Sequence, residues 1–116
     1  MLAKRLQEAR TVDPAALRCV VEVRGAGRIV CVEGEIDPST IRQLRDAIRD
    51  AVEASPERLV IDLAGVTFMD STALHALIDA DHRCRAAALH LVIVPAPERV
   101  HHPFRIAGLE GRLPFA

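Results

Sequence analysis

The sequence predicts an α/β fold in which a mixed sheet of four to five strands is covered by three to four helices. Runs rich in valine, isoleucine and leucine alternate with segments whose apolar residues recur at helical spacing. Half of the 116 residues are apolar but only 3% are aromatic, so aliphatic side chains must fill the core, as suits helices packed on a sheet. The expected order is β-β-α-β-α-β-α-β, with helices mainly on one face.

The first 13 residues are expected to form an N-terminal extension. Residues 1–12 carry apolar side chains at helical spacing, which permits either a short amphipathic helix or a mobile arm. The Asp13-Pro14 pair breaks any such helix. A single domain is therefore expected over residues 14–116, a length that suits one core.

Two strands are expected to form a β-hairpin at the start of the domain. Leu17–Arg24 and Arg28–Glu33 are rich in β-branched residues, and Gly25-Ala26-Gly27 between them can turn the chain. These glycines also begin a G-x-G-x-x-G pattern, but Val30 takes the third glycine position and a strand follows. The segment is therefore interpreted as a turn and not as a phosphate-binding loop.

A helix and a central strand are expected next. Asp37-Pro38-Ser39-Thr40 supplies N-cap and first-turn residues for a helix of about four turns. Its apolar face consists of Ile41, Leu44, Ala47, Ile48, Ala51 and Val52. Pro56 ends the helix, and the nearly continuous apolar run Leu59–Leu63 predicts a strand buried on both faces.

The remaining elements continue the alternation. A helix is expected from about Ser71 to Arg85, and Leu89–Val94 predicts another buried strand. The inward residues of that helix are expected to be Leu74, Leu77, Ile78 and Cys84. Two prolines precede a third helix that ends at Gly108, and a last short strand is expected to include Leu113–Phe115.

Composition argues against several classes of protein. With 15 basic and 16 acidic residues, the net charge of -1 gives no reason to expect nucleic-acid binding. No apolar run approaches the roughly 20 residues of a spanning helix, so a cytoplasmic protein without direct membrane insertion is expected. The three cysteines lack a C-x-x-C pair and are expected to be reduced and buried.

The junction between the central strand and the second helix is the most informative segment. An apolar strand leads into Asp70, Ser71 and Thr72, which open the helix. Asp and Ser are common helix N-caps, and this alone could explain either residue. A helix N-terminus also favours negative groups, so a phosphate on Ser71 would be accommodated there.

Three stretches in order and spacing resemble one family. Phe68–Leu74 resembles the motif F-[ML]-D-S-[ST]-G-L, Val32–Asp37 resembles a GE[IL]D turn, and Phe104–Leu109 resembles an FRITGL helix ending. The family is that of STAS domains, best known as bacterial anti-sigma factor antagonists. The resemblance covers roughly residues 17–115 and implies the STAS fold.

The resemblance implies a binding switch and not an enzyme. Such a protein, when unphosphorylated, binds an anti-sigma factor with serine kinase activity and so frees a sigma factor for transcription. Phosphorylation releases it, and a phosphatase resets the switch. ATP and magnesium belong to the partner, and this chain needs no cofactor. Ser71 matches the phosphorylated position, with Thr72 second. The implied partner-binding residues are Asp37, Asp70, Ser71, Thr72, Ala73 and His75.

Two departures from the family motif favour an alternative. Ala73 replaces a glycine, and His75 replaces a residue that is commonly small. Either change could restrict a kinase. The alternative function is a non-switching STAS subunit that scaffolds a stress-signalling or lipid-transport complex. Asp37 could equally be the N-cap of the first helix, and a monomer or weak dimer is expected.

The same helix contains a possible catalytic pair and a possible set of metal ligands. Ser71 and His75 are four residues apart, but Met69 and Ala73 replace the glycines of a G-x-S-x-G elbow, so a hydrolase is not expected. A set of possible metal ligands shares one helical face: His75, Asp79 and His82. Solvated surface explains them better, and no metal site is expected.

Overall fold

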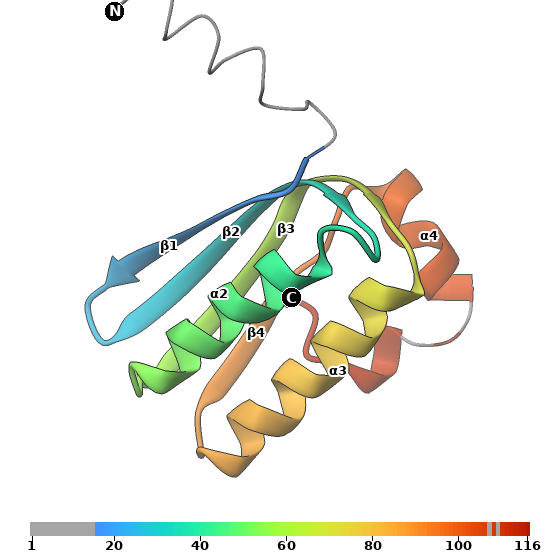
Figure 1. Ribbon diagram of the computed structural model, residues 1–116. Helices are drawn as coiled ribbons and strands as arrows, with labels where there is room; N and C mark the ends of the chain where they lie inside the picture. Colours follow the sequence, from blue (N-terminus) through green and yellow to red (C-terminus); the bar gives the residue numbers. More distant parts are fainter. Residues whose placement is uncertain (1–15, 107, 109) are drawn as a thin grey trace, which may run out of the picture.

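The computed structural model describes residues 16–106, 108 and 110–116, so the predicted extension over residues 1–13 lies outside the described residues. Within the described part, four strands form one sheet in the order β1-β2-β3-β4 (Figure 1). The strands are β1 (Arg18–Arg24), β2 (Gly27–Ile36), β3 (Arg58–Met69) and β4 (His90–Val94). The helices are α2 (Ile41–Glu53), α3 (Ser71–Ala86), α4 (Glu98–Ile106) and a 3₁₀ helix (Glu110–Arg112).

The sheet is mixed, as the sequence predicts. β1 and β2 are antiparallel and join through a two-residue turn in which Gly25 has a φ of 57°, so the predicted hairpin is confirmed. β2 and β3 are parallel, as are β3 and β4. The β2–β3 register ends at the pair Ile36–Met69, which brings the carboxyl ends of these two strands together.

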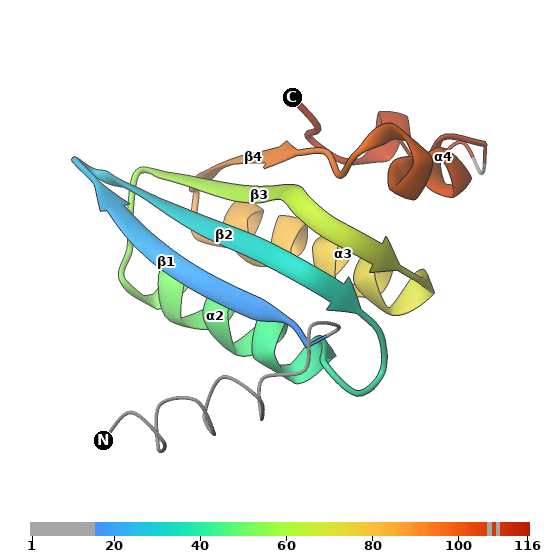
Figure 2. The same ribbon diagram turned by 90° about the horizontal axis from the view of Figure 1, so that it is seen from above.

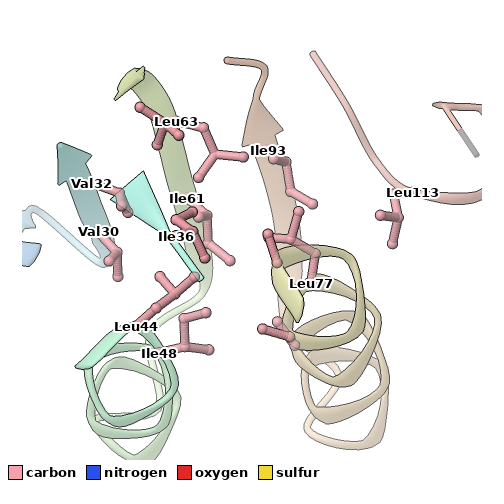
Figure 3. Packing of buried hydrophobic residues seen from close by; sticks show 14 of the residues in the cluster. Val30, Val32, Ile36, Leu44, Ile48, Ile61, Leu63, Leu77, Ile93 and Leu113 are labelled. Carbon is pink, nitrogen blue, oxygen red and sulfur yellow. The ribbon is translucent and has the colours of Figure 1, made fainter. Parts of the chain in front are cut away.

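Helices α2 and α3 pack side by side on one face of the sheet (Figure 2). Aliphatic side chains from the strands and from both helices point toward one another and form the core (Figure 3). Leu44, Ile61 and Leu77 are completely buried there. Helix α4 lies apart from this pair and contacts β3. The predicted cover of one face by crossover helices is therefore confirmed for α2 and α3.

The buried face of α3 is built mostly from small residues. Ala73, Ala76 and Ala80 are buried together with Leu77 and Cys84. The sequence predicted Leu74 and Ile78 on the inward face, but both are only partly buried and pack at its border. Alanine side chains let α3 approach the sheet closely, so they form the centre of the contact.

The ends of several predicted strands differ in the structure. β2 continues beyond Glu33 to Ile36. β3 continues beyond Leu63 to Met69, so the residues before Asp70 belong to the strand. The predicted last strand over Leu113–Phe115 is wrong, since that segment forms a single parallel bridge between Ile93 and Phe115 after the 3₁₀ helix. Pro114 has no N–H to donate, which limits the ladder to two hydrogen bonds with Ile93.

Gly34 gives β2 its shape before the site. Its φ is 106°, and the register of β2 against β3 shifts between Gly34 and Glu35. A Cβ at this position would lie 2.2 Å from the carbonyl oxygen of Ala16, where the chain enters β1. Only glycine permits both the backbone angle and the close approach. The glycine of the GE[IL]D-like turn is therefore required by a contact with residues distant in the sequence.

Candidate functional site

The candidate site lies where β2 and β3 end. Ile36 and Met69 are neighbours in the sheet, and Asp37 and Asp70 are the next residues of their chains. The chain leads from these points into α2 and α3, whose first turns lie at the same end of the sheet (Figure 1). Parallel pairing therefore places two carboxylates and the start of two helices on one surface.

Asp70 caps α3 and engages Thr72. Its backbone is extended, with a φ of -118°, and its Oδ1 accepts a hydrogen bond of 2.9 Å from the Thr72 backbone N–H. The Thr72 hydroxyl donates to the same carboxylate oxygen. Of the two possible caps in the sequence, Asp70 is thus the N-cap of α3, and Thr72 is half-buried with its hydroxyl engaged.

Ser71 presents its hydroxyl to solvent. Its side chain is exposed on the first turn of α3, and no residue in the described ranges hydrogen-bonds its Oγ. The two adjacent hydroxyls therefore differ in kind, because Thr72 is part of the helix cap and Ser71 is available to a visiting protein. Sequence alone ranked Ser71 above Thr72 only through the family resemblance.

Asp37 organises the turn before α2. Its Oδ1 accepts bonds from the Ser39 hydroxyl at 2.7 Å, the Ser39 N–H at 2.9 Å and the Thr40 N–H at 3.1 Å. The hydrogen bond from the Ser39 hydroxyl, reinforced by these N–H donors, lowers the pKa of Asp37, because each donor favours the carboxylate. Helix α2 begins at Ile41 with Thr40 before it, and Thr40 makes no side-chain cap bond. The Asp37 carbonyl accepts from the Ile41 N–H, so Asp37 makes the hydrogen bonds of a cap for the turn that leads into α2.

The two remaining predicted partner-binding residues, Ala73 and His75, differ in exposure. Ala73 has an exposed fraction of 0% and packs in the core, so its expected contact with a partner requires correction. His75 is exposed on α3, one turn beyond Ser71. The helical periodicity that buries Ala73 leaves His75 outward.

The catalytic and metal-site alternatives find no geometric support. No hydrogen bond joins Ser71 to His75 within the described chain, so a serine nucleophile lacks its base. Asp79, a member of the possible metal set, instead accepts a 2.6 Å bond from Arg45 of α2. Among the described residues, no three His, Cys, Asp or Glu side chains are placed to hold a metal ion.

Phe68 adds an apolar element that sequence reasoning did not assign to the site. It is 47% exposed at the end of β3, two residues before Asp70. Together with Met69, Arg99 and Pro103 it lines a shallow hollow between β3 and α4. Phe68 belongs to the part of β3 that extends beyond the predicted strand Leu59–Leu63, so the apolar pattern did not place this residue in the strand. A useful signal was available, since Phe68 is one of only three aromatic residues in the chain.

Comparison with known proteins settles the family. Residues 18–116 match the model of the STAS domain. This chain belongs to the STAS domain family. The anti-sigma-F factor antagonist RsfA of Mycobacterium tuberculosis is 28% identical over 101 residues, which cover 85% of this chain and 79% of RsfA. The crystal structure of an anti-sigma factor antagonist from Mycobacterium paratuberculosis is 30% identical with a TM-score of 0.77, covering 89% of this chain and 87% of that chain.

Within the STAS family, this chain stands with the anti-sigma factor antagonists. Proteins of this type bind anti-sigma factors, and they are regulators rather than enzymes. The unphosphorylated form of the antagonist SpoIIAA has the same fold, with a TM-score of 0.70 at 19% identity over 85% of this chain and 88% of that one. The predicted STAS fold is therefore confirmed. No helix in the described ranges is both long and apolar enough to cross a membrane.

Proposed function

We propose that this STAS protein is a phosphorylation-regulated anti-sigma factor antagonist whose switch residue is Ser71. Unphosphorylated, it binds an anti-sigma factor that is also a serine kinase, and this sequestration frees a sigma factor for transcription. Phosphorylation of Ser71 releases the partner, and a phosphatase resets the switch. The observation that carries the proposal is that Ser71 is exposed on the first turn of α3 while the neighbouring Thr72 hydroxyl is bound to Asp70.

The electrostatics of the surface explain how one phosphate would act. A phosphoserine adds a charge of about -1.5 to -2 next to Asp70. The positive end of α3 favours an anion, but the Thr72 N–H is already occupied by the Asp70 carboxylate. The added charge therefore remains on the contact surface, where a partner must desolvate it. A penalty of about 3 kcal/mol weakens binding roughly a hundredfold, without any change of fold.

Exposed apolar surface next to Ser71 gives a partner something to bind. Phe68 precedes the switch by three residues and is 47% exposed. Aromatic side chains of this kind often anchor protein interfaces. A charged switch beside an apolar anchor permits tight binding in one state and release in the other.

Of the two departures from the motif that favoured the scaffold alternative, Ala73 and His75, only His75 still favours it. Ala73 is completely buried, so its methyl group cannot block a kinase from the surface. His75 remains exposed one turn from Ser71 and is the residue to test for an effect on kinase approach. Replacing His75 with alanine in the phosphorylation assay below separates its effect from that of Ala73.

Intact-mass measurement tests the assignment of the switch. The protein would be purified from its own cells, resting and stressed, beside the variants Ser71→Ala and Thr72→Ala. We expect one phosphate that phosphatase removes, that Ser71→Ala lacks and that Thr72→Ala retains. A phosphate that persists in Ser71→Ala, or a chain unmodified under both conditions, would contradict the switch.

Binding measurements test its consequence. The anti-sigma factor kinases of the same organism would be titrated with the wild type, the enzymatically phosphorylated protein and Ser71→Ala. We expect one kinase to bind the unmodified protein and Ser71→Ala alike, and the phosphorylated protein roughly a hundredfold more weakly. A partner that binds phosphorylated and unphosphorylated protein equally would instead support the scaffold.

A further inference from the structure

We propose that strand β1 pairs with β1 of a second copy, forming a symmetric dimer through a continuous sheet. β1 is an edge strand, since it pairs with β2 on one side only within the described residues. Alternate residues of an antiparallel edge strand direct their N–H and C=O groups away from its partner, and these groups can bind another strand. This inference does not rest on the proposed switch at Ser71.

The exposed apolar side chains of the described chain are concentrated on this strand. Five large apolar residues are exposed in the described chain, and three of them belong to β1. Val20 and Val21 are each 40% exposed, and Val23 is 64% exposed. Valine favours strands and packs across pairs of strands. A solvent-exposed edge of this composition is suited to pairing.

The two edges of the sheet are treated differently. At β4, the segment after the 3₁₀ helix occupies the edge at Ile93, which donates to the Pro114 carbonyl and accepts from the Ala116 N–H. At β1, two of the devices that usually block an edge, proline and a bulge, are missing from the strand, and its charges are of both signs, so a second copy can pair them. The strand contains no proline or lysine, and its register against β2 runs without a bulge from Arg18 to Arg24.

The charged residues of β1 favour one register of pairing between the two copies. A two-fold axis through Val20 places Arg18 of one copy opposite Glu22 of the other, twice by symmetry. The same register pairs Cys19 with Val21 and Leu17 with Val23 across the axis. Moving the axis to Val21 would instead place Arg18 opposite Arg24, a like-charge pair that opposes binding. Arg18 has no ionic partner within the described residues, so it is available for this contact.

The proposed interface leaves the candidate site free. β2 lies between β1 and β3, and β3 leads into Asp70 and Ser71. The pairing involves neither α3 nor α4. Each copy in the dimer would therefore keep its own partner-binding surface, so one dimer could hold two anti-sigma factors.

Sedimentation velocity from about 1 µM to about 1 mM tests the proposal with the full chain. An interface formed by one seven-residue strand from each copy is small and should be weak. We therefore expect monomer at the lower concentration and dimer at the higher one. Val20→Lys brings two ammonium groups together on the axis and should leave only monomer. Ile106→Lys is the matched control, because it introduces the same charge at an exposed apolar residue on α4 and should still dimerise.

A charge-reversal pair tests the register. Arg18→Glu should weaken dimerisation at least about tenfold, and adding Glu22→Arg should restore it to within about threefold of the wild type. The second change also removes the exposed 3.4 Å contact between Glu22 and Arg24, which contributes little. A wild type that stays monomeric at 1 mM, a dimer that survives Val20→Lys, or a double variant that fails to recover would overturn the proposal.

Discussion

Replacing Gly34 with alanine should destabilise the protein strongly. The φ of 106° is strained for any residue with a Cβ and costs about 1–3 kcal/mol. The new methyl carbon would also lie 2.2 Å from the Ala16 carbonyl oxygen, so the start of β1 must move by about 1 Å, which adds about 1–3 kcal/mol. The expected loss is therefore about 4 kcal/mol, a large part of the 5–15 kcal/mol typical of a domain.

Gly108→Ala is the matched control for this loss. Gly108 also has a positive φ, 72°, but nothing lies within 4 Å of a Cβ there, so only the conformational cost of about 1 kcal/mol remains. Urea unfolding followed by circular dichroism measures both variants against the wild type, provided that the slope with denaturant is unchanged. Equal losses for the two variants would refute the close approach of β1 to Gly34.

Three further outcomes are expected. Asp70→Ala should lower the free energy of unfolding by about 1 kcal/mol through loss of the α3 cap, while Asp70→Asn retains an acceptor and should lose less; urea unfolding distinguishes them. The pKa of Asp37 is lowered in the folded state, so the ionised carboxylate stabilises the fold above the unfolded pKa, and this stabilisation is lost as pH falls through the folded pKa. Asp37→Asn should therefore have a lower free energy of unfolding than the wild type at pH 7. The difference in free energy between the two proteins should shrink in acid. Burial raises the pKa of Cys19 to about 11, so alkylation of this thiol at pH 8, followed by peptide mass spectrometry, should be roughly a hundredfold slower than in the unfolded chain; equal rates would contradict this.

Local signals in the sequence predicted most of the elements. The Gly25 turn between two valine-rich strands predicted the hairpin, and the run after Pro56 predicted the central strand. The sequence offered Asp70 and Ser71 as possible caps of α3, because an acceptor before a helix satisfies N–H groups two or three residues later, and the structure selects Asp70. Each of these features depends on residues close together in the chain, so periodicity and capping rules are enough to predict it.

Element ends were predicted less well, because they depend on neighbours in space. β3 continues to Met69 since β2 extends beside it as far as Ile36, a pairing that the apolar run alone does not reveal. The segment at Phe115 has an apolar composition typical of a strand, yet Pro114 and the single bridge to Ile93 limit it. Strand length is determined by hydrogen-bonding partners as well as by composition.

By itself, the sequence determined the α/β alternation, the STAS motifs and the position of Ser71 at the start of a helix. The tertiary structure alone decided that Ala73 lies in the core, that Gly34 meets the start of β1, and that Thr72 is engaged by Asp70 while Ser71 faces solvent. Among the described residues, it also left the valines of β1 exposed on a strand that pairs on one side only. These outcomes depend on packing and hydrogen-bond geometry between side chains whose positions are set only when the whole sheet and its helices assemble.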